Sequence, residues 1–160
     1  MPRRKSVNLI RDIGVDPLFG DLRVQKLINV VMKRGKKSIA RSIVYDALGL
    51  IAKKQGGADK VLKVFHRAVE QVVPVVEVRA RRVGGGVFQV PTQVREHRAL
   101  SLAYRWLVSA SAQRRDKTMG QRLGYELLEA YEGRGNAVKK KLDVHKMAEA
   151  NRAFSHYAWV

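Results

Sequence analysis

Apolar residues recur every three or four positions along most of the chain, and this spacing is interrupted once, after Pro74. Such spacing places apolar side chains on one face of an α-helix. The segment after Pro74 instead alternates and is rich in β-branched residues, which is typical of strands. In the middle of that segment lies Gly84-Gly85-Gly86, which indicates a tight turn between two strands. The pattern therefore predicts helices and one β-hairpin over 75–90, with Pro91 ending its second strand.

Each of six expected helices combines a capping residue with an apolar stripe. The expected caps are Asp21, Ser38, Asp59, Thr92, Asp116 and Asn136, and Gly35 is expected to end the first helix. The expected inward-facing residues are Val24, Leu27, Ile28 and Val31; Ile39, Ile43, Ala47 and Ile51; Leu62, Phe65, Val69 and Val72; Ala99, Leu102, Ala103, Trp106 and Ala110; Met119, Leu123, Leu127 and Ala130; and Val138, Leu142, Met147 and Ala148. At 160 residues the chain is long enough for one domain with its own core. We therefore expect a mainly α fold, a six-helix single domain with a protruding two-stranded β-hairpin arm.

The charge of the chain indicates a polyanionic partner. Lys and Arg number 32 against 14 Asp and Glu, which gives a formal net charge of +18. Nucleic acid and an anionic membrane are the candidates. A membrane-surface helix concentrates its cations on one polar face, whereas here much of the charge lies in expected loops and in the hairpin. This distribution favours nucleic acid. No apolar run approaches the ~20 residues that span a bilayer, and we find no secretory signal. We therefore expect a cytoplasmic protein, although an organelle-encoded protein would have the same features.

Residue types that carry catalysis or hold cofactors are absent or scattered. The chain has no Cys, which excludes disulfides, thiolate nucleophiles and Cys-ligated zinc. Its four His show no metal-binding spacing, and the Gly-rich segments do not match a phosphate-binding loop. Two-metal nucleases need clustered Asp and Glu, and these are dispersed here. We therefore expect no enzyme activity, no cofactor and no metal site.

Three segments are expected from these patterns: a basic N-terminal arm over 1–19, a helical nucleic-acid-binding domain over 20–150, and a C-terminal tail over 151–160. In the hairpin, Arg79 and Arg81 point to one side and Arg82 to the other, so neither face should be buried in a core without stranding charge. Trp106 is interpreted as a core residue. For the tail aromatics, docking on the core and stacking on bases remain equally open.

Several segments closely resemble the bacterial small-subunit ribosomal protein seven family. They are EVRARRVGGG at 77–86 with QVP at 89–91, DPLFGD at 16–21, SLAYRWL at 101–107, GNAVKKK at 135–141 and MAEANRAF at 147–154. The resemblance covers nearly the whole chain. It departs from common members in the first dozen residues and at 86–88.

This resemblance implies a structural constituent of the small ribosomal subunit with a mostly α fold and a β-ribbon. It implies a primary ribosomal RNA binder that nucleates assembly of the head domain. It also implies a place at the subunit interface, near the exit-site tRNA and the mRNA path and beside small-subunit ribosomal proteins nine and eleven, without an obligate homo-oligomer. By the same resemblance, the residues that contact RNA are Arg3, Arg4, Lys5, Lys36, Lys37, Arg79, Arg81, Arg82, Arg95, Arg114 and Arg115.

Two other classes of protein are alternatives to an RNA binder. An architectural DNA-binding protein also uses arms on a helical body, but such arms usually carry an apolar or Pro wedge at the tip, and the glycine turn has none. An enzyme would need clustered acids or a nucleophile, and neither is found in this sequence. A ribosomal RNA-binding protein is therefore the favoured interpretation.

Overall fold

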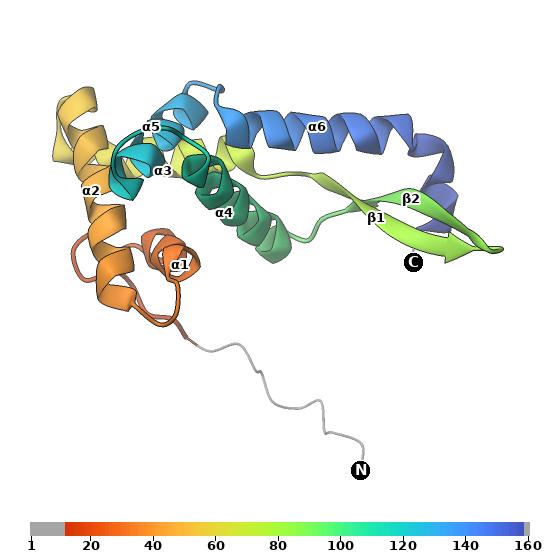
Figure 1. The fold of residues 1–160 in the computed structure, drawn as a ribbon, viewed down its shortest axis with the longest axis horizontal. Helices are drawn as coiled ribbons and strands as arrows, with labels where there is room; N and C mark the ends of the chain where they lie inside the picture. The colour runs from red at the N-terminus through yellow and green to blue at the C-terminus, as the bar shows by residue number, and fades with distance from the viewer. Residues whose placement is uncertain (1–11, 159–160) are drawn as a thin grey trace, which may run out of the picture.

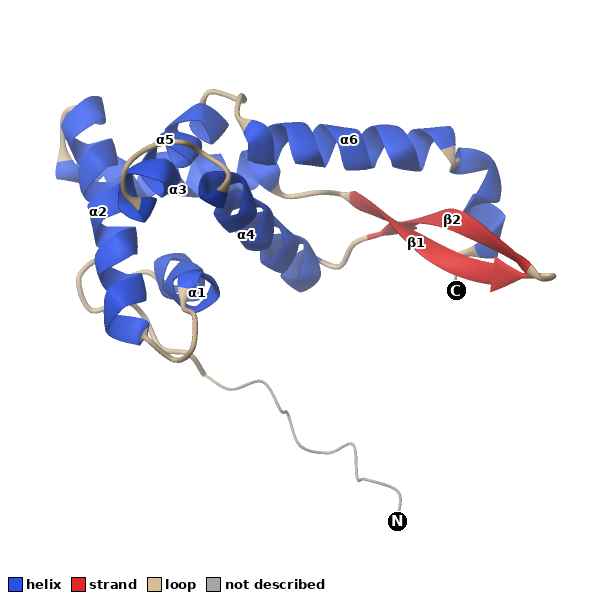
Figure 2. Cartoon of the chain, in the orientation of Figure 1, coloured by secondary structure: helices blue, strands red, loops and turns tan. Residues whose placement is uncertain are grey.

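The computed structural model describes residues 12–158, except for the side chains of Ala58 and Asp59. Within that range the chain forms six α-helices, a two-stranded antiparallel sheet and one 3₁₀ helix (Figures 1 and 2). The elements are α1 (Leu22–Val31), α2 (Lys37–Gln55), α3 (Ala58–Val72), β1 (Val76–Val83), β2 (Gly86–Gln93), α4 (Glu96–Ala112), α5 (Met119–Tyr131), α6 (Asn136–Ala150) and η1 (Arg152–Tyr157). The expected six helices and hairpin are confirmed.

Helix α5 lies at the centre of the bundle and packs against α2, α3 and α4. Two glycines allow its close approach to α2. A Cβ atom on Gly120 would lie 2.7 Å from the Cβ of Asp46, and one on Gly124 would lie 3.1 Å from the carbonyl oxygen of Ala47. Fully buried Leu123 and Leu127 of α5 fill the space between the helices. The bundle is thus a packed body from which α6 and the hairpin extend together (Figure 1).

Asp21 caps α1 as expected. Its Oδ1 accepts from the backbone N–H groups of Arg23 at 2.6 Å and Val24 at 3.0 Å, while its Oδ2 lies 2.7 Å from Nε2 of His66 in α3. One side chain therefore both starts α1 and ties it to α3.

We expect Asp21→Ala to lower the free energy of unfolding by about 1–2 kcal/mol, because the cap acceptor is lost. Asp21→Asn keeps an acceptor for the same N–H groups and is the control, with a smaller loss. Chemical denaturation of both variants measures the difference. Equal losses in the two variants would show that the cap is not what stabilises this end of α1.

The other five expected caps are wrong, as is the expected end of the first helix. Ser and Asn also occupy first-turn positions, and Asp also occupies turns, so their presence near a helix start does not locate the cap itself. Thr92 lies in β2, and Asp116 lies in the turn before α5. Helix α1 ends at Val31, before Gly35. The cap positions are held by Lys36, Gly57, Arg95, Thr118 and Gly135 for α2 to α6, and only Thr118 among these accepts a capping hydrogen bond through its side chain.

The inward stripes are confirmed for most helices and wrong at three residues. Ile39, Leu142 and Met147 are about half exposed. Ile39 lies in the first turn of α2, and the other two lie on α6. In α4, Tyr104 and Leu107 are the large buried side chains, whereas Trp106 is only partly covered. Periodicity locates an apolar face, but neighbouring helices decide how much of it is covered.

The hairpin continues beyond its expected end. Strands β1 and β2 pair from Val76 with Gln93 to Val83 with Gly86, so Pro91 lies within β2. A proline is tolerated there because each strand of a two-stranded sheet has a free edge. At the tip, Gly84 and Gly85 have φ of +55° and +85°, the left-handed conformations that a two-residue type I′ turn requires. The result is a tight-tipped ribbon that projects beside α6.

Candidate nucleic-acid interface

Helix α4 separates two groups of the residues predicted to contact RNA. At its N-terminal end lie Arg95 and the hairpin, which leads directly into it. At its C-terminal end, a cavity of about 230 Å³ brings Lys36 of the loop after α1 next to Ala112 of α4 and Met119 of α5. The 114–117 turn follows α4 at this same end. The seventeen residues of α4 rise ~25 Å, so about that length of helix separates Arg95 from the 114–117 turn.

Five of the predicted RNA-contacting residues carry exposed cationic groups. They are Lys36, Lys37, Arg82, Arg95 and Arg115, all exposed and none hydrogen-bonded or ion-paired through its side chain within 12–158. A Lys or Arg without an intramolecular partner can bind a phosphate without first breaking a contact. These five are therefore the strongest candidates in the described part of the chain. Arg3, Arg4 and Lys5 lie outside the described residues.

Two of the hairpin arginines are engaged within the protein. The Nε of Arg79 donates to Oε1 of Glu77 at 2.5 Å, and the Nε of Arg98 donates to the same oxygen at 2.9 Å. The side chain of Glu77 is only 10% exposed, so it joins the base of the hairpin to α4. On the same face, Arg81 donates to the backbone carbonyl of Tyr157 in η1. These contacts position the ribbon relative to the helices.

One face of the hairpin is covered without stranding charge, contrary to the expectation from its arginines. Phe88 lies opposite Arg81 in the ribbon, and its ring centroid is 5.1 Å from that of Phe154 and 5.8 Å from that of Tyr157. Segment η1 thus covers this face, and helix α6 also packs against both strands. Charge is not stranded there because Arg81 finds a carbonyl oxygen and Arg79 a carboxylate. Arg82, on the opposite face, remains exposed.

The same contacts show where two of the tail aromatics lie. Phe154 and Tyr157 dock on the hairpin rather than on the helical core. Trp159 lies outside the described residues. The two docked rings are occupied by protein contacts, which favours the docking alternative over base stacking for them.

Arg114 lies in an ion-pair cluster rather than on the surface. Its guanidinium donates to both oxygens of Glu129 at 2.7 and 2.8 Å, to Glu126 at 3.0 Å and to Asp116 at 3.1 Å. Its hydrogen bonds to Glu129 raise the pKa of Arg114, and Arg114 in turn lowers the pKa of Glu129. Glu126 is fully buried, and its other oxygen accepts from the backbone N–H of Ala137 at 2.8 Å. Arg114 therefore joins α5 to the start of α6, a structural role that the sequence did not indicate.

His145 links α6 to the chain entering the hairpin. Its Nε2 accepts from the backbone N–H of Val75 at 3.2 Å, so the bonded ring is neutral. Burial, followed by the positive charge of Lys141, lowers the pKa of His145 below its ordinary value of 6.5. As pH falls, the His145 ring is protonated in the unfolded chain before it is protonated in the folded chain. The stability that neutral His145 contributes is therefore complete above pH 6.5, and it is lost as pH falls through the lowered pKa of the folded state.

We expect the free energy of unfolding to fall between pH 7 and pH 5, before most carboxylates titrate. His145→Gln, which does not titrate, should show a smaller fall over the same window. Urea denaturation at several pH values measures both proteins. Identical pH dependence would mean that His145 does not contribute to the acid sensitivity.

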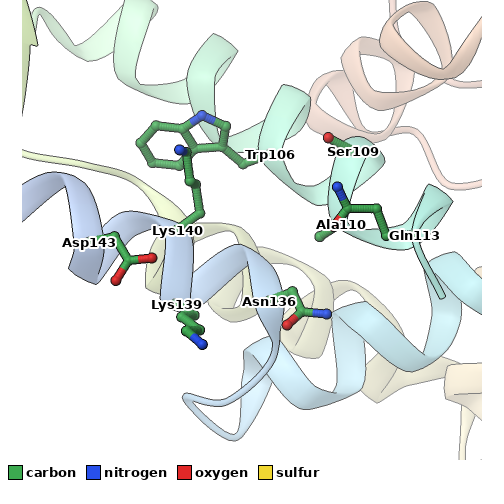
Figure 3. A pocket seen from close by; sticks show the side chains of 8 residues that line it. All are labelled: Trp106, Ser109, Ala110, Gln113, Asn136, Lys139, Lys140 and Asp143. Atoms are coloured by element: carbon green, nitrogen blue, oxygen red, sulfur yellow. The ribbon is translucent and has the colours of Figure 1, made fainter.

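A polar cavity of about 360 Å³ lies between α4 and α6 (Figure 3). Trp106 lines this cavity and is only partly buried, so it is not solely a core side chain as the sequence predicted. Ser109 of α4 and Gln113, the residue that caps its C-terminal end, follow Trp106 at three- and seven-residue spacing, which places all three on one side of the helix. This mixed polar and aromatic spacing was the available sequence signal. Lys140 lines the same cavity from α6.

Within the described residues, no group of three or more His, Asp or Glu side chains is arranged to hold a metal ion. The helices of that part include none with the length and apolar character needed to cross a membrane.

Comparison with known proteins gives a consistent result over almost the whole sequence. Residues 2–152 match the family described as ribosomal protein S7p/S5e. The small ribosomal subunit proteins uS7 of Pelobacter propionicus and Bradyrhizobium diazoefficiens are each 54% identical to this chain, over 99% of it and 100% of their own length. That of Granulibacter bethesdensis is 50% identical over 98% of both chains. With its helical bundle, β-ribbon and exposed cations, the chain belongs to the ribosomal protein S7p/S5e family.

Proposed function

We propose that this protein is a primary ribosomal RNA binder that nucleates assembly of the head domain of the small ribosomal subunit. Family membership makes it a structural, non-enzymatic constituent of the ribosome, working in the cytoplasm. The observation that carries the RNA-binding proposal is the pair of exposed cationic groups at the two ends of α4. Lys36, Lys37 and Arg115 at one end, and Arg95 at the other with Arg82 farther out along the ribbon, can bind phosphates of one folded RNA.

Arg79 and Arg81 have a different role in this proposal. Arg81 holds the ribbon against η1, and Arg79 pairs with Glu77, the carboxylate that Arg98 of α4 also binds, while Arg82 is presented on the open face. Arg114 is assigned to the ion-pair cluster and not to RNA. The basic arm over 1–19, including Arg3, Arg4 and Lys5, is proposed to add contacts to those of the body over 20–150, with 151–160 as the tail.

The projecting part of the molecule is proposed to lie at the subunit interface. The hairpin and α6 extend together from the bundle (Figure 2), a shape that suits contact with more than one RNA. In the proposed arrangement they lie near the exit-site tRNA and the mRNA path, with small-subunit ribosomal proteins nine and eleven as neighbours. The protein acts there as a single copy.

The architectural DNA alternative is weaker on the structure as well. The hairpin tip consists of Gly84 and Gly85, which offer no side chain to insert between base pairs. The flanking Val83 and Gly86 pair with one another at the end of the ribbon.

Chemical footprinting on small-subunit ribosomal RNA tests the proposal. Added alone, the protein should protect a contiguous set of nucleotides in the head domain at low concentration. Bovine serum albumin controls for nonspecific effects, and a DNA duplex competitor for charge alone. Protection that appears only after other ribosomal proteins are added would contradict primary binding, and no protection at all would contradict RNA recognition.

A further inference from the structure

The cavity between α4 and α6 has polar groups that the fold does not use. Gln113, the residue after α4, and Asn136 and Lys140 of α6 line it, and within residues 12–158 none of these side chains makes a hydrogen bond or ion pair. In Figure 3, Lys140 and Trp106 lie at one end of the cavity, and Gln113 and Asn136 lie at the other. Aromatic surface, positive charge and amide groups are thus gathered around one space.

This combination fits the parts of a nucleotide. A Trp ring is a stacking surface for any base, because every base has a π-face. The ammonium of Lys140 can bind the phosphate or ribose oxygens, and the amides of Gln113 and Asn136 can donate to or accept from a base edge. The carboxylate of Asp143, at the rim, repels phosphate but can accept from a base amino group.

The size of the cavity limits what it can hold. At about 360 Å³ it falls at the small end of the ~300–1,000 Å³ range of ligand sites. A double helix does not enter such a space, whereas one base turned out of a loop or bulge does. A site that bound only RNA phosphates would need neither the Trp106 ring nor the two side-chain amides. The lining of the cavity therefore favours an unpaired nucleotide over a contact with the RNA backbone alone.

We propose that the α4–α6 cavity binds a single unpaired nucleotide of the ribosomal RNA, with its base stacked on Trp106. The proposal rests on the proposed function, because the nucleotide belongs to the RNA that the protein binds. It adds a base-contacting site to a surface that otherwise binds phosphates.

The emission of Trp106 reports on the site directly. The chain has two tryptophans, so in the Trp159→Phe variant all tryptophan emission comes from Trp106. We expect an adenylate RNA hexamer to change this emission saturably at low salt, because a stacked base alters the excited indole. An abasic ribose-phosphate hexamer, with similar charge and no bases, should leave the emission nearly unchanged even where fluorescence anisotropy of the labelled oligomer shows binding.

A matched pair of lysine variants, made in the Trp159→Phe protein, tests the location. Lys140→Ala should weaken the emission change several-fold and lower the salt slope by about one. Lys146→Ala removes the same charge from the same helix at an exposed position outside the cavity lining and should have a smaller effect. Hexamer binding without a change in Trp106 emission, or equal effects of the two variants, would overturn the proposal.

The same experiment separates this inference from the proposed function. If the Trp159→Phe protein footprints on ribosomal RNA but its emission does not respond to the base-containing hexamer, only the nucleotide site is wrong. If it gives no footprint on the ribosomal RNA, the proposed function fails, and with it the source of the nucleotide.

Discussion

Replacing Arg114 by Ala should lower the free energy of unfolding by about 3–5 kcal/mol, whereas replacing Arg115 should change it by less than ~0.5 kcal/mol. The two residues are adjacent and chemically identical, but Arg114 is 18% exposed and pairs with a fully buried carboxylate. Without the guanidinium, Glu126 keeps only its bond from the Ala137 N–H. An uncompensated buried carboxylate is among the costliest defects that a single substitution creates.

Denaturant unfolding of both variants measures the difference, and Glu126→Gln supplies the control. In the Glu126→Gln protein, Arg114→Ala should cost less, because no buried charge is left unpaired. The effects on RNA should be reversed: Arg115→Ala should lower the salt dependence of binding, and folded Arg114→Ala should keep it. Equal stability losses at the two positions would refute the structural assignment of Arg114.

The second large effect concerns RNA affinity and its dependence on salt. If the protein neutralises about 6–10 phosphates, its affinity for ribosomal RNA should fall by ~10³–10⁵ between 50 and 200 mM salt. The triple variant Lys36→Ala, Arg82→Ala, Arg95→Ala should lower the magnitude of the salt slope by ~2–3, because each lost phosphate contact removes about one unit. Its thermal stability should be nearly unchanged, since all three side chains are exposed and unpaired within 12–158.

A second triple variant, Lys53→Ala, Lys60→Ala, Lys63→Ala, is the matched control. It removes the same charge from exposed positions on α2 and α3, none of which is a predicted RNA contact. If only net charge mattered, both variants would bind RNA equally weakly. Filter binding over a range of salt concentrations distinguishes the two results. A flat salt response of the unmodified protein would indicate apolar docking instead of phosphate binding.

Sequence alone determined the features that depend on neighbouring residues. The six helices and the ribbon follow from periodicity, the type I′ tip from Gly84 and Gly85, and the cap at Asp21 from its position before an apolar stripe. Net charge indicated a polyanionic partner without any coordinates. Each of these properties is set within a few residues or summed over the chain.

The tertiary structure alone decided which of the basic residues are available. Arg81 and Arg82 differ by one position, yet one pairs with η1 and the other is exposed, because η1 covers a single face of the ribbon. Arg114 is enclosed because α5 presents Glu126 and Glu129 to it. The Trp106 cavity forms where α6 passes α4. These outcomes depend on how elements far apart in the sequence pack together, and no local spacing encodes that packing.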